Sequence, residues 1–299
     1  MPAKPAKKAR TASAGEGNAD AYPRQKGRQE NNREEACIQA AQVGLAIPRG
    51  RPRPASSNKG SHETARHLPH GLQCGWSDAP PRWRPKGSGG DLFERVHDEL
   101  AGDAWLVGRV TGQEFAKGKP YSASTKETFP REPWFARRDA KAYGVVLDAH
   151  GKIGWGRSDI GGDPIVVVLS EAVSDAHLAG LRGEGVSYIF AGKSELDLAL
   201  ALDILNRELG VKQLLLEGGG GANGAFLRAG LVDELNLILC PAVDGAKGAP
   251  SVFDSTDAEA DRRAPVTAMT LESSQALEGG AMLLRYRIQN ADIQSATGR

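Results

Sequence analysis

The chain has 299 residues, with 38 Lys and Arg against 37 Asp and Glu and a formal net charge of +1. This balance gives no overall electrostatic reason to expect binding to nucleic acid or to a membrane surface. Cys37, Cys74 and Cys240 are far apart and form no CxxC pair, which argues against a disulfide framework or a metal site and favours a reducing compartment. No apolar run is long enough to span a bilayer and no hydrophobic signal core is present, so we expect a cytoplasmic protein.

Residues 1–82 differ in composition from the rest of the chain. They are rich in Arg, Lys, Pro, Gly, Ser and Ala and lack sustained apolar periodicity, so they cannot bury enough apolar surface to offset the cost of ordering the backbone. Only EEACIQAAQVGLAI (34–47) has the composition of a helix. We expect a disordered tail. The alternative is a basic arm for nucleic acid or a targeting address, but aromatic residues are nearly absent and no basic run is long.

From residue 91 onward the pattern is that of an α/β domain. Helices are predicted where apolar residues recur every three or four positions, at 91–102, 174–185, 196–210 and 222–230. Strands are predicted at short apolar or alternating runs, at 104–108, 143–151, 164–170, 186–192, 213–221, 233–243 and 282–290. This alternation predicts a mostly parallel central sheet with helices on both faces, and the late strands predict an antiparallel end. We expect one domain over 83–290 and a flexible tail over 291–299.

The stretch LLLEGGGGANGAFLRAG (214–230) is the most informative one. An apolar strand runs into consecutive glycines and a helix starts at once, so a ligand can approach a backbone that carries no Cβ. The unpaired N–H groups of the helix start favour an anion such as a pyrophosphate. The pattern is neither a Rossmann GxGxxG, which would come early in the domain, nor a P-loop, which would continue with Lys and Ser or Thr.

Three segments together resemble a known family. EGGGGANGAFLRAGLVDELNLILCPAVDGAKGAPSVF (217–253), DAWLVGRVTGQEF (103–115) and RWRPKGSGGDLFERVHDEL (82–100) are similar, in order and spacing, to signatures of the pyrimidine reductases of riboflavin biosynthesis. That family includes the C-terminal half of the bifunctional deaminase-reductase. The resemblance implies a three-layer fold like that of dihydrofolate reductases, NADPH as cofactor and a homodimer. The deaminase half is not expected, since His62 and Glu63 are not followed by the cysteines that its zinc site needs.

The resemblance also implies roles for individual residues. Glu217 and Arg109 would bind the sugar-phosphate part of the substrate. The alternatives are that Glu217 interacts with helix N–H groups and that Arg109 is an ordinary surface arginine. Trp83 would lie against the cofactor or, alternatively, plug the edge of the domain. The cofactor-binding set implied by the family is Trp83, Gly108, Thr111, Gly218, Gly219, Gly220, Gly221, Ala222, Asn223 and Gly224. No general acid is identified.

The implied reaction is hydride transfer from NADPH to the ribosyl C1′ of a 5-phosphoribosylamino-pyrimidine, which gives a ribitylamino product. Because the cofactor supplies the hydride, the protein contributes mainly alignment and electrostatic support. Two alternatives remain: an oxidoreductase of the same fold acting on another substrate, and an inactive domain that serves as a binding module. Turnover of the pyrimidine distinguishes the first alternative from the implied reaction. Titration with NADPH distinguishes the second, because an inactive binding module would show no saturable binding.

The resemblance departs from the family at its start, where members have a first strand reading approximately VICHMxSSVDGR. Nothing similar precedes Trp83, and the corresponding place holds HLPHGLQCGWSDA (67–79). The degenerate codons of this segment, read one nucleotide later, permit ICHMASSVDGRM. The alternative is coincidence. We therefore expect residues up to about 81 to be a shifted-frame reading, and the chain as written to lack this strand and part of its site.

Overall fold

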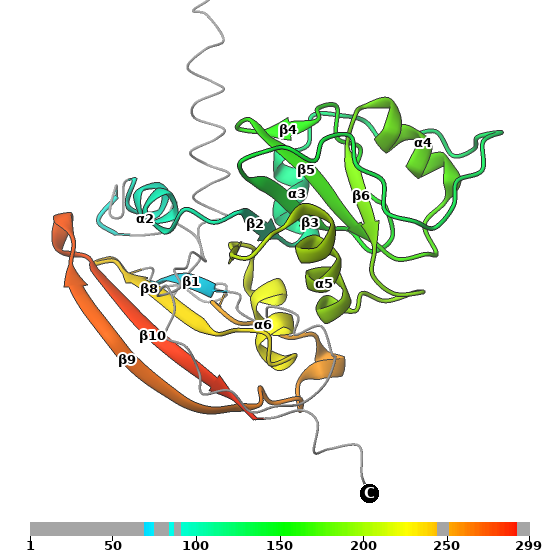
Figure 1. The fold of residues 1–299 in the computed structure, drawn as a ribbon. Helices are drawn as coiled ribbons and strands as arrows, with labels where there is room; N and C mark the ends of the chain where they lie inside the picture. Colours follow the sequence, from blue (N-terminus) through cyan, green and yellow to red (C-terminus); the bar gives the residue numbers. More distant parts are fainter. Residues whose placement is uncertain (1–68, 75–83, 87–90, 244–250, 292–299) are drawn as a thin grey trace, which may run out of the picture.

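The computed structural model describes residues 69–74, 84–86, 91–243 and 251–291. Two sheets build the fold (Figure 1). The first sheet has six strands in the order β4-β5-β3-β2-β7, with β6 pairing to β5, and all its pairings are parallel except that of β4. Its strands are β2 (Ala104–Val107), β3 (Tyr143–Leu147), β4 (Asp159–Ile160), β5 (Asp163–Leu169), β6 (Ser187–Phe190) and β7 (Leu214–Leu216).

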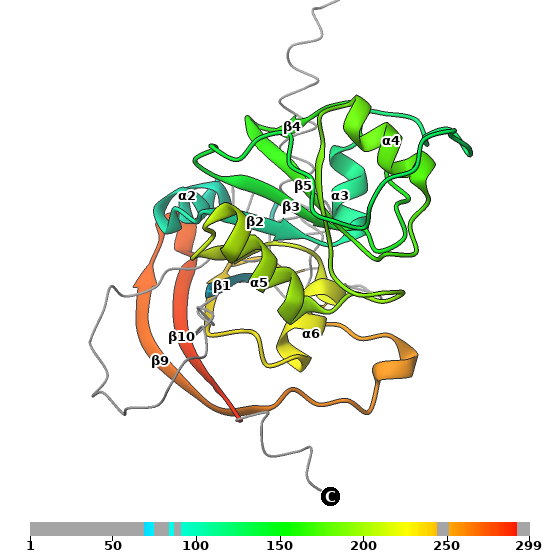
Figure 2. The same ribbon diagram turned by 45° about the vertical axis from the view of Figure 1, so that its right-hand side comes forward.

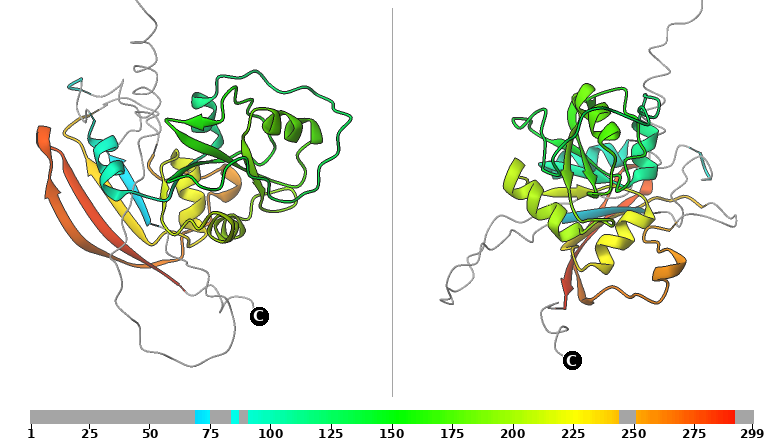
Figure 3. Two further views of the ribbon diagram at one scale, coloured as in Figure 1. Left: turned by 45° about the horizontal axis from the view of Figure 1, so that its top comes forward. Right: turned by 90° about the vertical axis from the view of Figure 1, so that its right-hand side faces the viewer.

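The second sheet has four strands in the order β1-β8-β10-β9. Its strands are β1 (Pro69–Cys74), β8 (Glu234–Leu239), β9 (Val266–Ala276) and β10 (Met282–Asn290). β1 is parallel to β8, whereas β10 is antiparallel to both β8 and β9. β1 also lies beside β7, so it is the element at which the two sheets meet. Figure 3 shows the long β9 and β10 strands forming an outer side of the molecule.

Helices cover both faces of the first sheet. The helices are α2 (Leu92–Leu100), α3 (Arg109–Phe115), α4 (Asp175–Gly183), α5 (Leu198–Leu209) and α6 (Gly220–Arg228). Apolar residues of α2 and α4 join one buried cluster, and those of α5 and α6 join the other. The positions of these helices around the first sheet can be followed in Figure 2. None of the described helices is long and apolar enough to cross a membrane.

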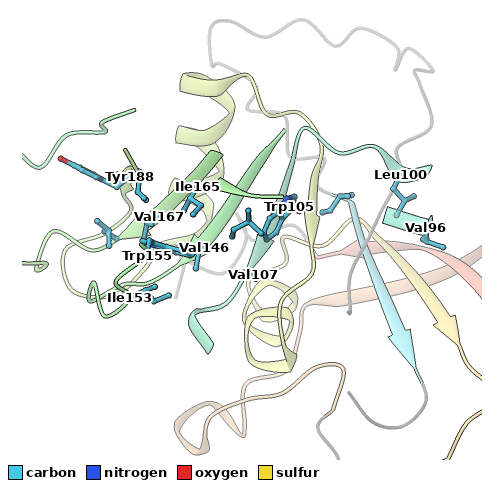
Figure 4. Close-up of a cluster of buried hydrophobic side chains, with 14 of the residues drawn as sticks. Val96, Leu100, Trp105, Val107, Val146, Ile153, Trp155, Ile165, Val167 and Tyr188 are labelled. Atoms are coloured by element: carbon cyan, nitrogen blue, oxygen red, sulfur yellow. The ribbon is translucent and has the colours of Figure 1, made fainter. Parts of the chain in front are cut away.

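The sequence explains the two cores directly. Val166, Val167 and Val168 of β5 are fully buried, as expected for a parallel strand that is covered on both faces. In the cluster on the α2 side, Trp105 of β2 lies between α2 and the side chains of β3 and β5 (Figure 4). Its indole Nε1 donates a hydrogen bond of 2.9 Å to Asp163 Oδ2, so the polar atom of this buried ring is satisfied.

The predicted architecture is confirmed: the central sheet is mostly parallel, the C-terminal strands are antiparallel, and helices lie on both faces. Helix α5 begins at the N-cap Asp197, whose side chain accepts from Leu200 N at 3.0 Å, and ends at Gly210 with φ 70°. Besides β1, the elements α3, β4 and β9 were not predicted from the sequence. Gly112 lets α3 pack against β3, since a Cβ there would lie 2.4 Å from Val146 Cγ1. β9 is mostly exposed and therefore has no apolar pattern.

The expectation that the chain lacks the family's first strand is wrong for the backbone. Residues 69–74, inside the segment that we interpret as a shifted-frame reading, form β1 in parallel register with β8, from Pro69 opposite Glu234 to Cys74 opposite Leu239. Pairing through main-chain N–H and C=O groups needs no particular side chains, so a short extended segment can fill a place beside β8 whatever its sequence. Residues 1–68 and the tail after residue 291 lie outside the described residues.

Candidate functional site

Two strand-to-helix turns lie side by side at the carboxyl ends of β2 and β7. The strands are parallel neighbours, and Glu217 N donates a hydrogen bond of 2.7 Å to Leu106 O. A Cβ on Gly218 would lie 2.3 Å from Val107 Cα and 2.5 Å from Gly108 N. Only glycine therefore lets the chain after β7 approach the end of β2 this closely.

The turn after β7 leaves main-chain donors unpaired. Gly219 has φ 34°, a conformation that favours glycine, and α6 starts at the next residue without a side-chain cap. In the described part of the chain, no acceptor receives a hydrogen bond from the amides of Gly219, Gly220, Gly221 and Ala222. We call Gly218–Gly221, together with the first turn of α6, the glycine corner. Four amides at a helix N-terminus are suited to bind an anion.

One side of the glycine corner is closed by the segment 251–254. Asp254 N donates to Gly220 O at 2.8 Å, and Asn223 Nδ2 donates to Val252 O at 3.0 Å. A Cβ on Gly224 would lie 1.9 Å from Asp254 O, so Gly224 is needed for this packing. The structure thus gives Asn223 and Gly224 a role in holding the segment 251–254 against α6.

The other side of the glycine corner is open. Gly221 is exposed, and a Cβ built on it would meet no atom within 4 Å. A Cβ on Gly219 would lie 3.7 Å from Thr111 Oγ1, and a Cβ on Gly108 would lie 3.3 Å from Ala222 Cβ. The structure therefore brings Gly108 and Thr111 of the β2–α3 turn next to the predicted cofactor-binding glycines.

The remaining predicted site residues differ in where they lie. Arg109 is exposed in the first turn of α3, and it forms no ion pair with any described residue. Trp83 lies outside the described residues. Their predicted roles stay predictions.

Glu217 has a partner that sequence reasoning did not identify. It is buried, with 6% of its surface exposed, and its Oε1 makes a close contact with His97 Nδ1 from α2. It does not bind the helix N–H groups, which was the alternative for this residue. The Glu217 carboxylate raises the pKa of His97 to about 9, while burial raises the pKa of Glu217 itself. His97 comes directly after Val96, one of the buried residues of α2. The apolar spacing of α2 gave no indication that His97 contacts a residue 120 positions away.

Comparisons with known proteins agree on one family. The model of the RibD C-terminal domain matches residues 77–283. A curated relative in Methanothermobacter thermautotrophicus, named 2,5-diamino-6-ribosylamino-4(3H)-pyrimidinone 5′-phosphate reductase, is 30% identical over 126 residues, which cover 42% of this chain and 56% of the relative. A relative of the same name in Aquifex aeolicus is 30% identical over 89 residues, 30% of this chain and 39% of the relative.

The matched segments therefore span about half of the first curated relative and less of the second. Among solved structures, a pyrimidine reductase-like protein from Corynebacterium diphtheriae aligns with 69% of this chain and 86% of its own, with 20% identity and a TM-score of 0.48.

Proposed function

Because the chain belongs to the RibD C-terminal domain family, we propose that it is an NADPH-dependent reductase of a 5-phosphoribosylamino-pyrimidine. The observation that carries the proposal is the glycine corner beside the end of β2, where four main-chain amides have no partner in the described part of the chain and the position of Gly221 is open. An anionic dinucleotide fits this place, since the amides and the N-terminal end of the α6 dipole both favour phosphate oxygens. The names of the curated relatives support the same substrate class.

The chain's own residues have separate tasks in this proposal. The amides of Gly219–Ala222 bind the pyrophosphate of the cofactor, and Thr111 and Gly108 bound the same space from the neighbouring turn. When bound, NADPH supplies the hydride for C1′ of the ribosyl group. Glu217 accepts a hydrogen bond from the sugar, and the exposed Arg109 contacts the phosphate of the substrate. Their alignment of the two ligands is the protein's main contribution to rate.

Two assays test the proposal. Titration with NADPH should show saturable binding. Addition of the phosphoribosylamino-pyrimidine should then cause oxidation of NADPH, which is measured as the loss of NADPH absorbance. Saturable binding without turnover of the deaminated or the aminated pyrimidine would favour an oxidoreductase with another substrate. Absence of saturable binding would favour an inactive binding module and contradict the proposal.

The segment that contains β1 is the part of the chain whose sequence departs from that of the family. We propose that residues up to about 81 are a shifted-frame reading, and that the reductase domain comprises 83–290 together with a strand at the place of β1. Restoring the frame changes the sequence of this segment and keeps a place for a strand beside β8. We expect the frame-restored protein to turn over substrate faster than the chain as written. Genomic DNA in which the next frame cannot encode SVDGR would contradict this.

We also propose that the protein is a homodimer in the cytoplasm. β9 is an edge strand, exposed along most of its length, and it carries the exposed side chains of Met269 and Leu271. An exposed edge strand offers unpaired main-chain groups to the edge strand of a second copy, and the apolar side chains would be buried there. The buried free thiol of Cys240 fits a reducing compartment. Light scattering coupled to size-exclusion chromatography should give twice the mass of one chain, and a monomeric mass would contradict the dimer.

A further inference from the structure

A buried ion pair lies directly beneath the glycine corner. Glu217 follows the last residue of β7 and precedes Gly218, and its side chain lies on the α2 side of the sheet, where Leu215 two residues earlier also packs. There Glu217 Oε1 contacts Nδ1 of His97. The side chain of Glu217 is 8% exposed and that of His97 is 30% exposed, so the pair is reached from solvent through the histidine.

His97 occupies only one oxygen of the carboxylate. In the described part of the chain, Oε2 of Glu217 has no hydrogen-bond partner, and it is not among the buried atoms that lack one. The imidazole therefore fixes the orientation of the carboxylate and leaves one oxygen able to accept a hydrogen bond. A carboxylate held by a single partner on one side is arranged to receive a hydroxyl group on the other.

Burial disfavours the ionised form of Glu217. Removing a carboxylate from water disfavours its ionised form, and burial is the main cause that raises the pKa of Glu217. The charge and hydrogen bond of His97 oppose that rise. The charged groups that act on His97 are Glu217, Asp98 on its own helix and Asp163 on β5, and all three favour the imidazolium. The imidazole of His97 is thus protonated at neutral pH.

We propose that His97 is a positioning residue of this reductase: it keeps Glu217 ionised and oriented so that Oε2 can accept a hydrogen bond from a sugar hydroxyl of the substrate. This rests on the proposed function. The juxtaposition that carries it is the contact between α2 and the end of β7, at the residue next to the glycine corner. His97 acts through Glu217 and does not touch the reacting atoms.

The proposal has a definite pH dependence. With a folded-state pKa of about 9 against an ordinary value of 6.5, His97 is protonated at neutral pH and loses its proton as the pH rises through about 9. The stabilisation from the pair is therefore fully present below about pH 6.5 and is lost as the pH rises through about 9. Above that pH Glu217 loses its counter-charge, so the KM for the pyrimidine should rise while the affinity for NADPH stays the same.

Two substitutions of His97 separate its hydrogen bond from its charge. His97→Asn keeps a donor near the position of Nδ1 but carries no charge, whereas His97→Phe removes both and keeps the ring contact with Phe93, whose centroid lies 6.4 Å away. The matched control is His150→Asn, since His150 is an exposed histidine distant in sequence from the pair. The melting transition of each variant shows whether it folds.

The first readout is the titration of the His97 imidazole by NMR in protein with labelled histidine, with the signal assigned by its absence in His97→Asn. We expect a midpoint near pH 9 that falls by at least two units in Glu217→Gln. A midpoint near the ordinary 6.5 in the unmodified protein would overturn the proposal. This readout needs no substrate, so it decides the pairing even if the turnover assay contradicts the proposed function.

The second readout is the pH profile of KM and kcat. We expect the KM for the pyrimidine to rise about ten- to a hundredfold in His97→Phe and less in His97→Asn, as for the loss of a hydrogen bond to a charged group. Both variants should lose the step near pH 9, and the dissociation constant for NADPH should not change. His150→Asn should behave like the unmodified protein. Unchanged KM and an unchanged step in His97→Phe would overturn the proposal, because a merely structural histidine would affect folding alone.

Discussion

The two strands that flank β2 in the first sheet, β3 and β7, are each followed by a buried acidic residue, but the two carboxylates have different partners. After β3, Asp148 Oδ2 accepts hydrogen bonds from Lys152 N at 2.7 Å and Ile153 N at 2.9 Å. After β7, Glu217 contacts His97 on α2, and the amides of Gly219–Ala222 have no partner in the described part of the chain. One turn is closed by its own side chain. In the proposed function, the donors of the other turn bind the cofactor.

This contrast separates stability from binding. Unpaired donors cost stability unless water or a ligand satisfies them, so a turn that only connects two elements is expected to resemble the one after β3. The turn after β7 has glycines where a side chain could have served as a cap. The two turns should therefore respond to substitution in opposite ways, one in folding and the other in cofactor affinity.

The largest effect is expected at the closed turn. Asp148→Ala removes the acceptor of two main-chain donors, and hydrogen bonds to a charged group contribute about 1.5–3 kcal/mol each. The free energy of unfolding in urea should fall by about 3 kcal/mol or more, with no change in the dissociation constant for NADPH. Asp148→Asn keeps one acceptor oxygen and should lose less. A variant that keeps its stability but binds NADPH more weakly would erase the distinction between the two turns.

The next effect is expected at the open turn. Gly221→Asp places a negative charge where a Cβ meets no atom within 4 Å, in the first turn of a helix that tolerates acidic residues. The melting temperature should stay the same or rise, while NADPH binds about a hundredfold more weakly, since phosphate and carboxylate would compete for the same amides. Calorimetric titration measures this.

Two controls isolate the charge in that experiment. Gly221→Asn has the same shape as Gly221→Asp without the charge, and Gly221→Ala adds only a Cβ. Both should retain most of the affinity for NADPH. If the aspartate variant binds as tightly as the asparagine variant, phosphates do not bind at the glycine corner.

The smallest effect concerns the stability of the closed turn at acidic pH. His177 of α4 packs against Gly151, and burial lowers the pKa of His177 below its ordinary 6.5. The unfolded chain therefore binds a proton that the folded chain excludes, so stability should fall as the pH drops below about 6.5, by at most about 1.4 kcal/mol per pH unit. His97 stays protonated in that range, because its pKa is about 9. His177→Met should lose this slope, and an identical slope in that variant would assign it to other groups.

The elements that could be predicted are those with a local apolar or glycine pattern in the sequence. Continuous apolar runs such as Val166–Val168 predicted buried parallel strands, and the consecutive glycines after Glu217 predicted an open strand-to-helix turn. The long strand β9 was missed because it is exposed along most of its length, and an exposed strand has no apolar pattern. β1 was missed because its pairing depends on main-chain groups beside β8 and not on its own side chains.

Of the candidate site, the position of the glycine corner could be predicted from the sequence, whereas its contacts with distant segments could not. Residues next to one another along the chain, such as those of the glycine corner, could be assigned from a local pattern. The pairing of His97 with Glu217 could not, since it depends on how α2 crosses the end of β7. The roles of Asn223 and Gly224 in holding the segment 251–254 depend on a contact of the same kind.

The most direct test of the glycine corner is a ¹H–¹⁵N spectrum of the labelled protein recorded during titration with NADPH. The account predicts downfield shifts of the amides of Gly219, Gly220, Gly221 and Ala222 as they donate to phosphate oxygens, with the amides of Lys152 and Ile153 in the closed turn unchanged. Saturable binding that leaves those four amides where they were would contradict it.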